Sequence, residues 1–132
     1  MEKLKYISHE WATEAFRRLR QEITAEKMKF VTSSMITLYT NCPDGKDRAV
    51  YYRFVDGMVD EVSIRQGELP EAEFTIAGEY ETFAKISRAE MGSRSALMSG
   101  KLKLRGNMVK ALSLAAVVDR MNKVLATIPA EY

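Results

Sequence analysis

The dipeptide Asp56-Gly57 joins two runs rich in β-branched and aromatic residues, RAVYYRFV at 48–55 and MVDEVSI at 58–64. A two-residue connection of this kind is typical of a tight β-hairpin, because the glycine adopts the positive φ that the turn needs. A third run, KFVTSSMITLYT at 29–40, precedes them and is followed by a turn-forming segment at 42–45, Cys-Pro-Asp-Gly. The sequence therefore predicts a meander of three antiparallel strands.

An amphipathic helix is predicted before these strands, from residue 9 to about residue 26. Ser8 precedes it as a candidate N-cap. Apolar residues recur along it at every fourth position: Trp11, Ala15, Leu19 and Ile23. We expect this face of the helix to cover a core.

The second half of the chain alternates short strands with helices. Residues 72–78 and 100–106 alternate apolar and polar positions as strands do, whereas 80–87 and 88–98 have helical spacing. From Met108 onward the sequence predicts one amphipathic helix, whose apolar first half contains Ala111, Leu112, Ala115 and Ala116. We expect that half to be buried on more than one side.

This order of elements predicts an α+β fold, a mostly antiparallel sheet covered on one face by helices. The 132 residues are 46% apolar, and no repeat or linker divides them, so we expect a single domain over 1–132. A net charge of +2 is too small to direct the chain to nucleic acid, and no nucleic-acid partner is expected. One cysteine and no long apolar run predict a cytoplasmic location.

Motifs for catalysis or metal binding are missing from the sequence. His9 is the only histidine, which excludes a two-histidine zinc site, and Cys42 lies in a turn that offers no group to activate its thiol. No glycine-rich loop of the nucleotide-binding type occurs, so we expect no cofactor. The adjacent carboxylates of Asp60 and Glu61 leave open a small enzyme that works by acid/base chemistry.

Basic and methionine residues are the remaining features. Lys101, Lys103 and Arg105 alternate along the strand at 100–106, which is typical of an edge strand protected against aggregation and permits at most a transient membrane contact. Eight methionines are many for this length, and methionine adapts to irregular space and varied ligands. Four of them fall on predicted inner faces: Met58, Met98, Met108 and Met121.

The segments FTIAGEYETF at 74–83 and ALMSGKLKLRGNM at 96–108 resemble the sterol carrier protein type 2 domain family. The resemblance implies a five-stranded sheet covered by helices around an apolar cavity or tunnel. It implies binding or transfer of a fatty acid, an acyl thioester, an isoprenoid or a sterol-like lipid without catalysis. It also implies that the ligand contacts are spread over apolar positions.

Twelve residues are candidates for the lipid-binding site, by their match in position to this family and by their inward phase. They are Phe16, Leu19, Phe54, Met58, Phe74, Ile76, Phe83, Met98, Leu104, Met108, Leu112 and Met121. Each of them is equally compatible with a place in the core.

Three functions are weighed. The first is non-catalytic binding of a small apolar ligand, motivated by the family resemblance and the methionine-rich faces. The second is an accessory module that contacts a partner protein or forms a homodimer, with Trp11 and Phe16 at the interface. The third is an enzyme that uses Asp60 and Glu61.

Overall fold

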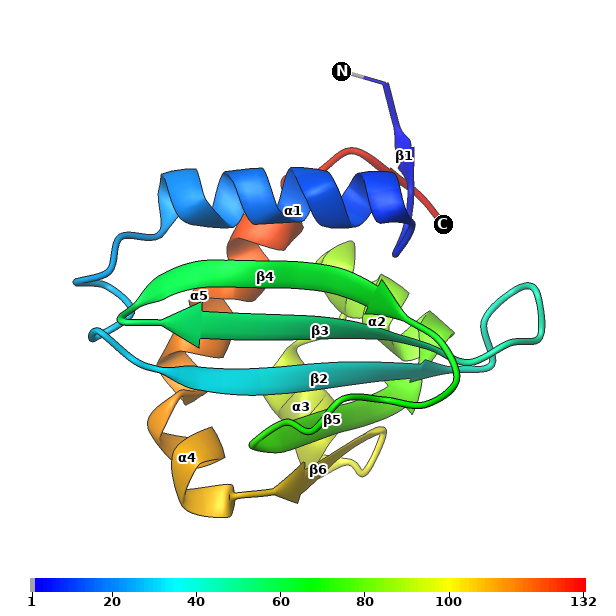
Figure 1. Cartoon of the computed structure of the whole chain (residues 1–132). Coiled ribbons are helices and arrows are strands. Elements are labelled where there is room, and N and C mark those ends of the chain that lie inside the picture. The colour runs from blue at the N-terminus through cyan, green and yellow to red at the C-terminus, as the bar shows by residue number, and fades with distance from the viewer. Residues whose placement is uncertain (1) are drawn as a thin grey trace.

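The computed structural model of the chain describes residues 2–132 (Figure 1). Its elements, in chain order, are β1 (Leu4–Lys5), α1 (His9–Glu22), β2 (Ser33–Thr40), β3 (Arg48–Val55), β4 (Met58–Arg65), β5 (Phe74–Glu79), α2 (Tyr80–Ser87), α3 (Ser93–Met98), β6 (Leu102–Gly106), α4 (Met108–Ser113), α5 (Ala115–Leu125) and β7 (Ala130–Glu131). Five strands form one sheet in the order β4-β3-β2-β5-β6. The two terminal strands, β1 and β7, pair with each other in parallel.

The sheet is mostly antiparallel, as the sequence predicts. Only β2 and β5 run parallel among its neighbouring strands, and β2, β3 and β4 form the predicted meander. Asp56 and Gly57 have φ values of 49° and 80°, so both residues of the hairpin turn are left-handed. The α+β fold class is therefore confirmed.

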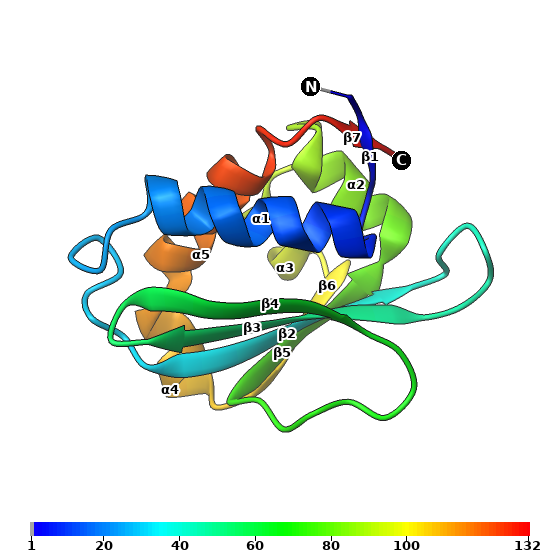
Figure 2. The same ribbon diagram turned by 45° about the horizontal axis from the view of Figure 1, so that its top comes forward.

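Helices cover one face of this sheet. Figure 2 shows α1, α2 and α5 on the same side of it. The amphipathic stripe of α1 points to the sheet, with Trp11 and Leu19 at 1% and 0% exposure, and each such side chain contributes about 2 to 3 kcal/mol of hydrophobic free energy. Ser8 caps the helix by accepting a hydrogen bond from the Trp11 backbone N–H at 3.2 Å.

The opposite face of the sheet is covered by a loop instead of a helix. Ile36, Ala49 and Tyr51 point to that side and are buried under the segment between β4 and β5, which contributes Leu69 and Ala72. The sheet therefore has a second, smaller apolar cluster, and the larger core lies between the sheet and the helices.

The link between α1 and β2 differs from the prediction of a strand that begins at residue 29. Helix α1 ends at Glu22, and the chain then makes turns in which Lys29 and Phe30 have positive φ. The side chain of Met28 is fully buried and belongs to the larger core. Burying this methionine takes precedence over the strand propensity of the residues around it, so β2 begins only at Ser33.

Two predicted helices are shorter or divided. The predicted helix at 88–98 is helical only from Ser93, because Ala89 has a φ of 61° and Gly92 is the N-cap. The predicted C-terminal helix is broken at Leu114 into α4 and α5. Burial of its first half on more than one side is a wrong prediction, because Ala111 is the buried residue of the short α4, while Leu112, Ala115 and Ala116 are exposed.

Candidate functional site

A small cavity lies inside the larger core, between the inner face of the sheet and the helices. Side chains of the strands form one wall: Met35, Thr37, Tyr39, Tyr52, Ile76 and Leu102. The other walls come from the N-terminal segment and from α1, α2 and α5: Tyr6, Trp11, Phe83, Ile86, Ser87, Val118, Met121, Asn122 and Leu125. The cavity measures about 50 Å³. Pockets that hold drug-sized ligands measure about 300 to 1,000 Å³, so this conformation is closed.

The sheet wall of the cavity carries hydroxyl groups, because alternate residues of a strand point to the same face and the inward-facing positions include threonine and tyrosine. Met35, Thr37 and Tyr39 alternate along the inner face of β2, and Tyr52 lies opposite Met35 on β3. Gly78 lies opposite Tyr39 on β5, and a Cβ atom there would come within 2.5 Å of the Leu102 side chain. The absence of a side chain at this position lets Leu102 and Phe83 close over the sheet.

The phenol groups that line the cavity are held in the neutral form. Burial raises the pKa of Tyr6 and that of Tyr52 well above the ordinary value for a phenol, and it also raises the pKa of Tyr39. These three side chains therefore stay protonated near neutral pH, and each keeps an O–H group that can donate a hydrogen bond.

Trp11 lies next to these phenols and brings a further donor. Its ring packs edge-on against Tyr6, with centroids 5.4 Å apart, and Tyr6 in turn packs against Tyr39 at 5.9 Å. The indole Nε1–H of Trp11 is buried and has no hydrogen-bond partner among residues 2–132. Trp11 is 1% exposed and part of the core, as expected for the apolar face of its helix, which contradicts the alternative that places Trp11 at a protein interface.

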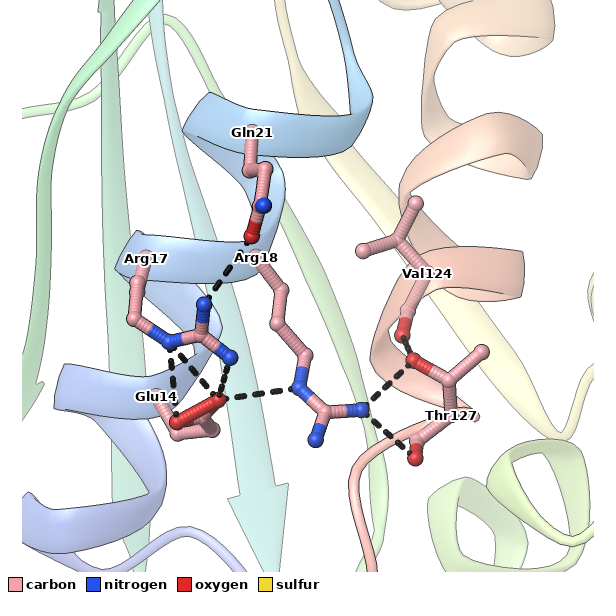
Figure 3. A network of polar contacts seen from close by, with 6 residues as sticks. All are labelled: Glu14, Arg17, Arg18, Gln21, Val124 and Thr127. Carbon is pink, nitrogen blue, oxygen red and sulfur yellow. Dashed lines mark hydrogen bonds and ion pairs between the residues drawn. The ribbon is translucent and has the colours of Figure 1, made fainter.

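A polar network holds α1 against the end of α5, which forms the helical wall of the cavity (Figure 3). Arg18 donates from Nη1 to the backbone oxygen of Thr127 at 2.7 Å and to its hydroxyl at 3.0 Å, and from Nε to Glu14 at 3.0 Å. The Thr127 hydroxyl donates to the backbone oxygen of Val124 at 2.6 Å. Hydrogen bonds from Arg17 and Arg18 lower the pKa of Glu14 to about 2.

The end of the cavity near the chain termini is closed by tyrosines. The Tyr132 hydroxyl donates to the hydroxyl of Ser87, a lining residue, at 2.7 Å. The rings of Tyr132 and Tyr6 pack with centroids 4.8 Å apart. Pairing of β1 with β7 brings these two residues together although they are far apart in the sequence.

Three of the twelve candidate residues line the cavity: Ile76, Phe83 and Met121. Leu19, Phe54 and Phe74 are buried in the same core, and Phe16 and Leu104 pack against it partly exposed. Met58 is half-buried at the start of β4. These six residues therefore lie outside the lining of the cavity in this conformation.

The remaining three candidates point to solvent. Met98, Met108 and Leu112 are 84%, 47% and 73% exposed, so the prediction that they face inward is wrong. Met98 is the last residue of the six-residue α3, and Met108 and Leu112 belong to the equally short α4, where Ala111 is the buried position. Helices of this length bury a narrow stripe, whereas the predicted periodicity extends over a longer segment.

The hydroxyl residues of the cavity are not among the twelve candidates, and Trp11 is expected from the sequence only as part of the buried face of its helix. The strand period was a usable signal for Thr37 and Tyr39, since both share the phase of Met35, and for Tyr52, which shares the phase of Phe54. For Tyr6 no such signal exists, because its place depends on the pairing of β1 with β7.

Other chemistry is remote from this cavity. Asp60 accepts a hydrogen bond from Arg53 at 2.7 Å, and Glu61, whose pKa is lowered first by the Ser63 hydroxyl, binds Arg65. Neither carboxylate lines the cavity. Burial raises the pKa of the Cys42 thiol, which disfavours the reactive thiolate. Residues 2–132 contain no cluster of three or more side chains suited to a metal ion, and no helix among them could cross a bilayer.

Comparison with known proteins identifies the family. The model of the SCP-2 sterol transfer family matches residues 13–119. The chain belongs to the SCP-2 sterol transfer family. Among curated protein sequences none matches it.

Members of this fold with solved structures resemble the chain in architecture. A crystal structure of sterol carrier protein 2 has a TM-score of 0.82 at 23% identity, covering 94% of this chain and 99% of that one. A conserved hypothetical protein from Thermus thermophilus, described as a possible sterol carrier protein, has a TM-score of 0.75 at 20% identity, with 99% and 94% covered. Palmitated SCP2L2 from Aedes aegypti has a TM-score of 0.58 at 15% identity, with 94% and 99% covered.

Proposed function

We propose that this SCP-2 family protein binds a lipid-like apolar ligand in the core between the sheet and α5, without catalysing a reaction, and that it delivers the ligand by opening and closing this core. The observation that carries the proposal is the internal cavity, lined mainly by apolar and aromatic side chains, in a chain that belongs to this family. Ile76, Phe83 and Met121 are the candidates from the sequence that would touch the ligand.

Burial of methylene groups supplies the driving force in this proposal. Each buried methylene contributes about 0.8 kcal/mol, and a dissociation constant of about 1 µM corresponds to about 8 kcal/mol. About ten buried methylenes therefore supply that free energy before the cost of ordering the ligand. A chain of this size does not fit into about 50 Å³, so the helices that cover the cavity must move away from the sheet for the ligand to enter.

Native mass spectrometry of the purified protein is the first test. The bare chain has a mass of 15.0 kDa, and a bound lipid adds a discrete mass that extraction then identifies. Titration with fatty acids, fatty alcohols, acyl-CoA and sterols follows if the protein is bare. Failure of all these compounds to bind would contradict the proposal.

Two neighbouring residues of α5 give a matched pair of variants. Leu125 lines the cavity and Val124 does not, although both are partly buried against the core. We expect Leu125→Trp to fill the cavity and weaken ligand binding at least tenfold, because an indole occupies the space that the ligand needs. Val124→Trp adds the same group outside the cavity, and this variant is expected to bind the ligand with nearly the affinity of the parent protein.

A contact surface for a partner protein is the second candidate function, and the exposed face of α4 favours it. Met108, Val109 and Leu112 are 47%, 80% and 73% exposed, which is unusual for three large apolar side chains on one short helix. Sedimentation of the protein as a monomer, both bare and lipid-loaded, would argue against a homodimer through this face. A dimer that Leu112→Glu dissociates would support it.

A further inference from the structure

Five side chains that carry a hydroxyl or indole group line the cavity and are here called the polar wall: Tyr6, Trp11, Thr37, Tyr39 and Tyr52. Its hydroxyls hydrogen-bond to one another, Thr37 with Tyr39 and Tyr52, and Tyr39 with Tyr6, so the indole N–H of Trp11 is the donor of this wall that is left over. Trp11 is 1% exposed, and its Nε1–H has no partner within residues 2–132. An indole N–H can only donate, so no rearrangement of its own proton satisfies it. Most buried N–H groups in folded proteins are paired with protein or with ordered water, so an orphan N–H on a side chain that lines a cavity is available to an acceptor inside that cavity.

Charge is missing from the lining of the same cavity. The fifteen lining residues, all within 2–132, include no Lys, Arg, His, Asp or Glu side chain. Their polar members are hydroxyl, amide and indole groups, which are neutral. An ionised carboxylate or phosphate taken into this space would lose its hydration without gaining a cation, and such a burial is strongly unfavourable.

On the basis of the proposed function, we propose that the ligand carries an uncharged hydrogen-bond acceptor, such as an ester, ketone or alcohol oxygen, which binds to the Trp11 indole N–H and the neighbouring hydroxyls of the polar wall. Its hydrocarbon part lies against the apolar side of the cavity, formed by α5 and the neighbouring strands: Ile76, Leu102, Val118, Met121 and Leu125. A fatty acid binds only in its protonated form, and a fatty acid anion is rejected.

A series of ligands with one chain length and different head groups tests this proposal. The probes are dodecane, 1-dodecanol, methyl dodecanoate and dodecanoic acid, with dissociation constants measured for each at about pH 6 and about pH 8. We expect the alcohol and the ester to bind most tightly and independently of pH. Dodecanoic acid is expected to lose about tenfold in affinity for each pH unit above its pKa, because the neutral form becomes rarer by that factor.

Variants of the polar wall test the role of its donors. Trp11→Phe and Tyr52→Phe each remove one donor and keep an aromatic ring. Each variant is expected to bind the alcohol and the ester with about threefold to tenfold lower affinity than the parent protein. Dodecane accepts no hydrogen bond, so its binding to these variants should change little. The ratio of alcohol to dodecane affinity within each variant is the readout, which cancels a general loss of stability.

Tyr51→Phe is the matched control. Tyr51 is next to Tyr52 on β3, but its side chain points to the opposite face of the sheet, where it belongs to the smaller apolar cluster. Removal of its hydroxyl should leave the ratio of alcohol to dodecane affinity as in the parent protein.

The outcomes separate this inference from the proposed function. Binding of dodecanoate at about pH 8 as tightly as the alcohol would overturn the inference but leave lipid binding intact. Equal affinity for dodecane and methyl dodecanoate, or an unchanged ratio in Trp11→Phe and Tyr52→Phe, would overturn the role of the polar wall. No binding of any probe would overturn the proposed function and the inference with it.

Discussion

Single side chains decide what the interior of this protein can accept. Thr37 shares the inward phase of its strand with Ser33, Met35 and Tyr39, and its hydroxyl donates to the backbone oxygen of Val50 at 3.5 Å. Trp11 belongs to the buried stripe of α1, yet its N–H is left without a partner among residues 2–132. Each of these groups is costly to bury alone, and the proposed preference for a ligand with a neutral hydrogen-bond acceptor rests on this cost.

Two glycines with nearly the same positive φ separate backbone strain from steric overlap. Gly45 has a φ of 79° and open space around it, whereas Gly57 has a φ of 80° and a Cβ atom there would lie 2.6 Å from the backbone oxygen of Ala25. We expect Gly45→Ala to lower the free energy of unfolding by about 1 kcal/mol and Gly57→Ala by about 3 kcal/mol or more. Urea denaturation measures both, and equal losses would contradict the steric argument.

Acid should weaken the network around Glu14. The guanidinium groups of Arg17 and Arg18 lower its pKa in the folded protein to about 2, below the ordinary value of a glutamate, so its contribution to stability is complete above the unfolded pKa and is lost as the pH falls toward 2. Because the network lies near the surface, we expect the ionised Glu14 to contribute about 1 kcal/mol to the free energy of unfolding. Glu14→Gln should therefore be less stable than the parent protein near neutral pH.

Denaturation of both proteins at several pH values provides the measurement for Glu14. The gap in their free energies of unfolding should shrink as the pH drops from about 5 toward 2, since the protonated glutamate and the glutamine then resemble each other. A gap that is constant over this range would show that the charge of Glu14 does not contribute.

At the scale of the elements, the C-terminal helices differ in how firmly they are held. Helix α5 is anchored by the buried side chains of Val117 and Met121 and by the hydrogen bonds of Arg18 to Thr127 near its end. Helix α4 presents most of its surface to solvent, and Ala111 is the one buried residue among its six. The break between them at Leu114 lets the two helices turn different faces to the sheet.

Two leucines on either side of Ser113 test this division. Leu114 is 6% exposed and Leu112 is 73% exposed. We expect Leu114→Ala to lower the free energy of unfolding by about 3 kcal/mol, because it leaves a cavity in the core, and Leu112→Ala by less than about 0.5 kcal/mol. Thermal and urea denaturation of the two variants give the values. A large effect at Leu112 would mean that α4 packs inward in solution.

At the scale of the whole molecule, the proposed binding requires that the helices rearrange while the sheet stays in place. The strands are joined by a continuous ladder from β4 to β6, and the outer face of the central strands is closed by the loop between β4 and β5. The helical wall is held by side-chain packing and by side-chain hydrogen bonds such as those of Arg18 to Thr127 and of Tyr132 to Ser87. Side-chain packing can be replaced by contacts with a ligand, whereas the backbone hydrogen bonds of the sheet cannot.

Hydrogen exchange should therefore change unequally on ligand binding. We expect the amides of α2 and α5 to exchange at altered rates when an apolar ligand is bound. The amides of β2, β3 and β4 should exchange at the same rates in the bound and in the ligand-free protein. Mass spectrometry of peptides after deuterium labelling reads out both groups in one experiment. Changes confined to the strands would contradict entry of the ligand between the sheet and α5.

Much of the fold could be predicted because the signals are local. Turn residues such as Asp56 and Gly57, together with the period of two, predict β3 with both of its ends, and the N-cap Ser8 marks the start of α1. The family resemblance at 74–83 and 96–108 is confirmed by the family match over 13–119. The prediction of inward-facing side chains failed in the two shortest helices, at Met98, Met108 and Leu112. A helix of six residues buries too few positions for the apolar periodicity of the sequence to indicate which face is buried.

The sequence by itself determined the α+β class, the meander, the strand phases and the family, since each depends on residues close together in the chain. Only the tertiary structure decided which groups share the cavity. Tyr6 reaches it through the pairing of β1 with β7, Trp11 from α1, and Thr37 and Tyr52 from the sheet. The meeting of groups from separate elements depends on how the helices lie on the sheet, and that arrangement follows from packing of the whole core rather than from any local pattern.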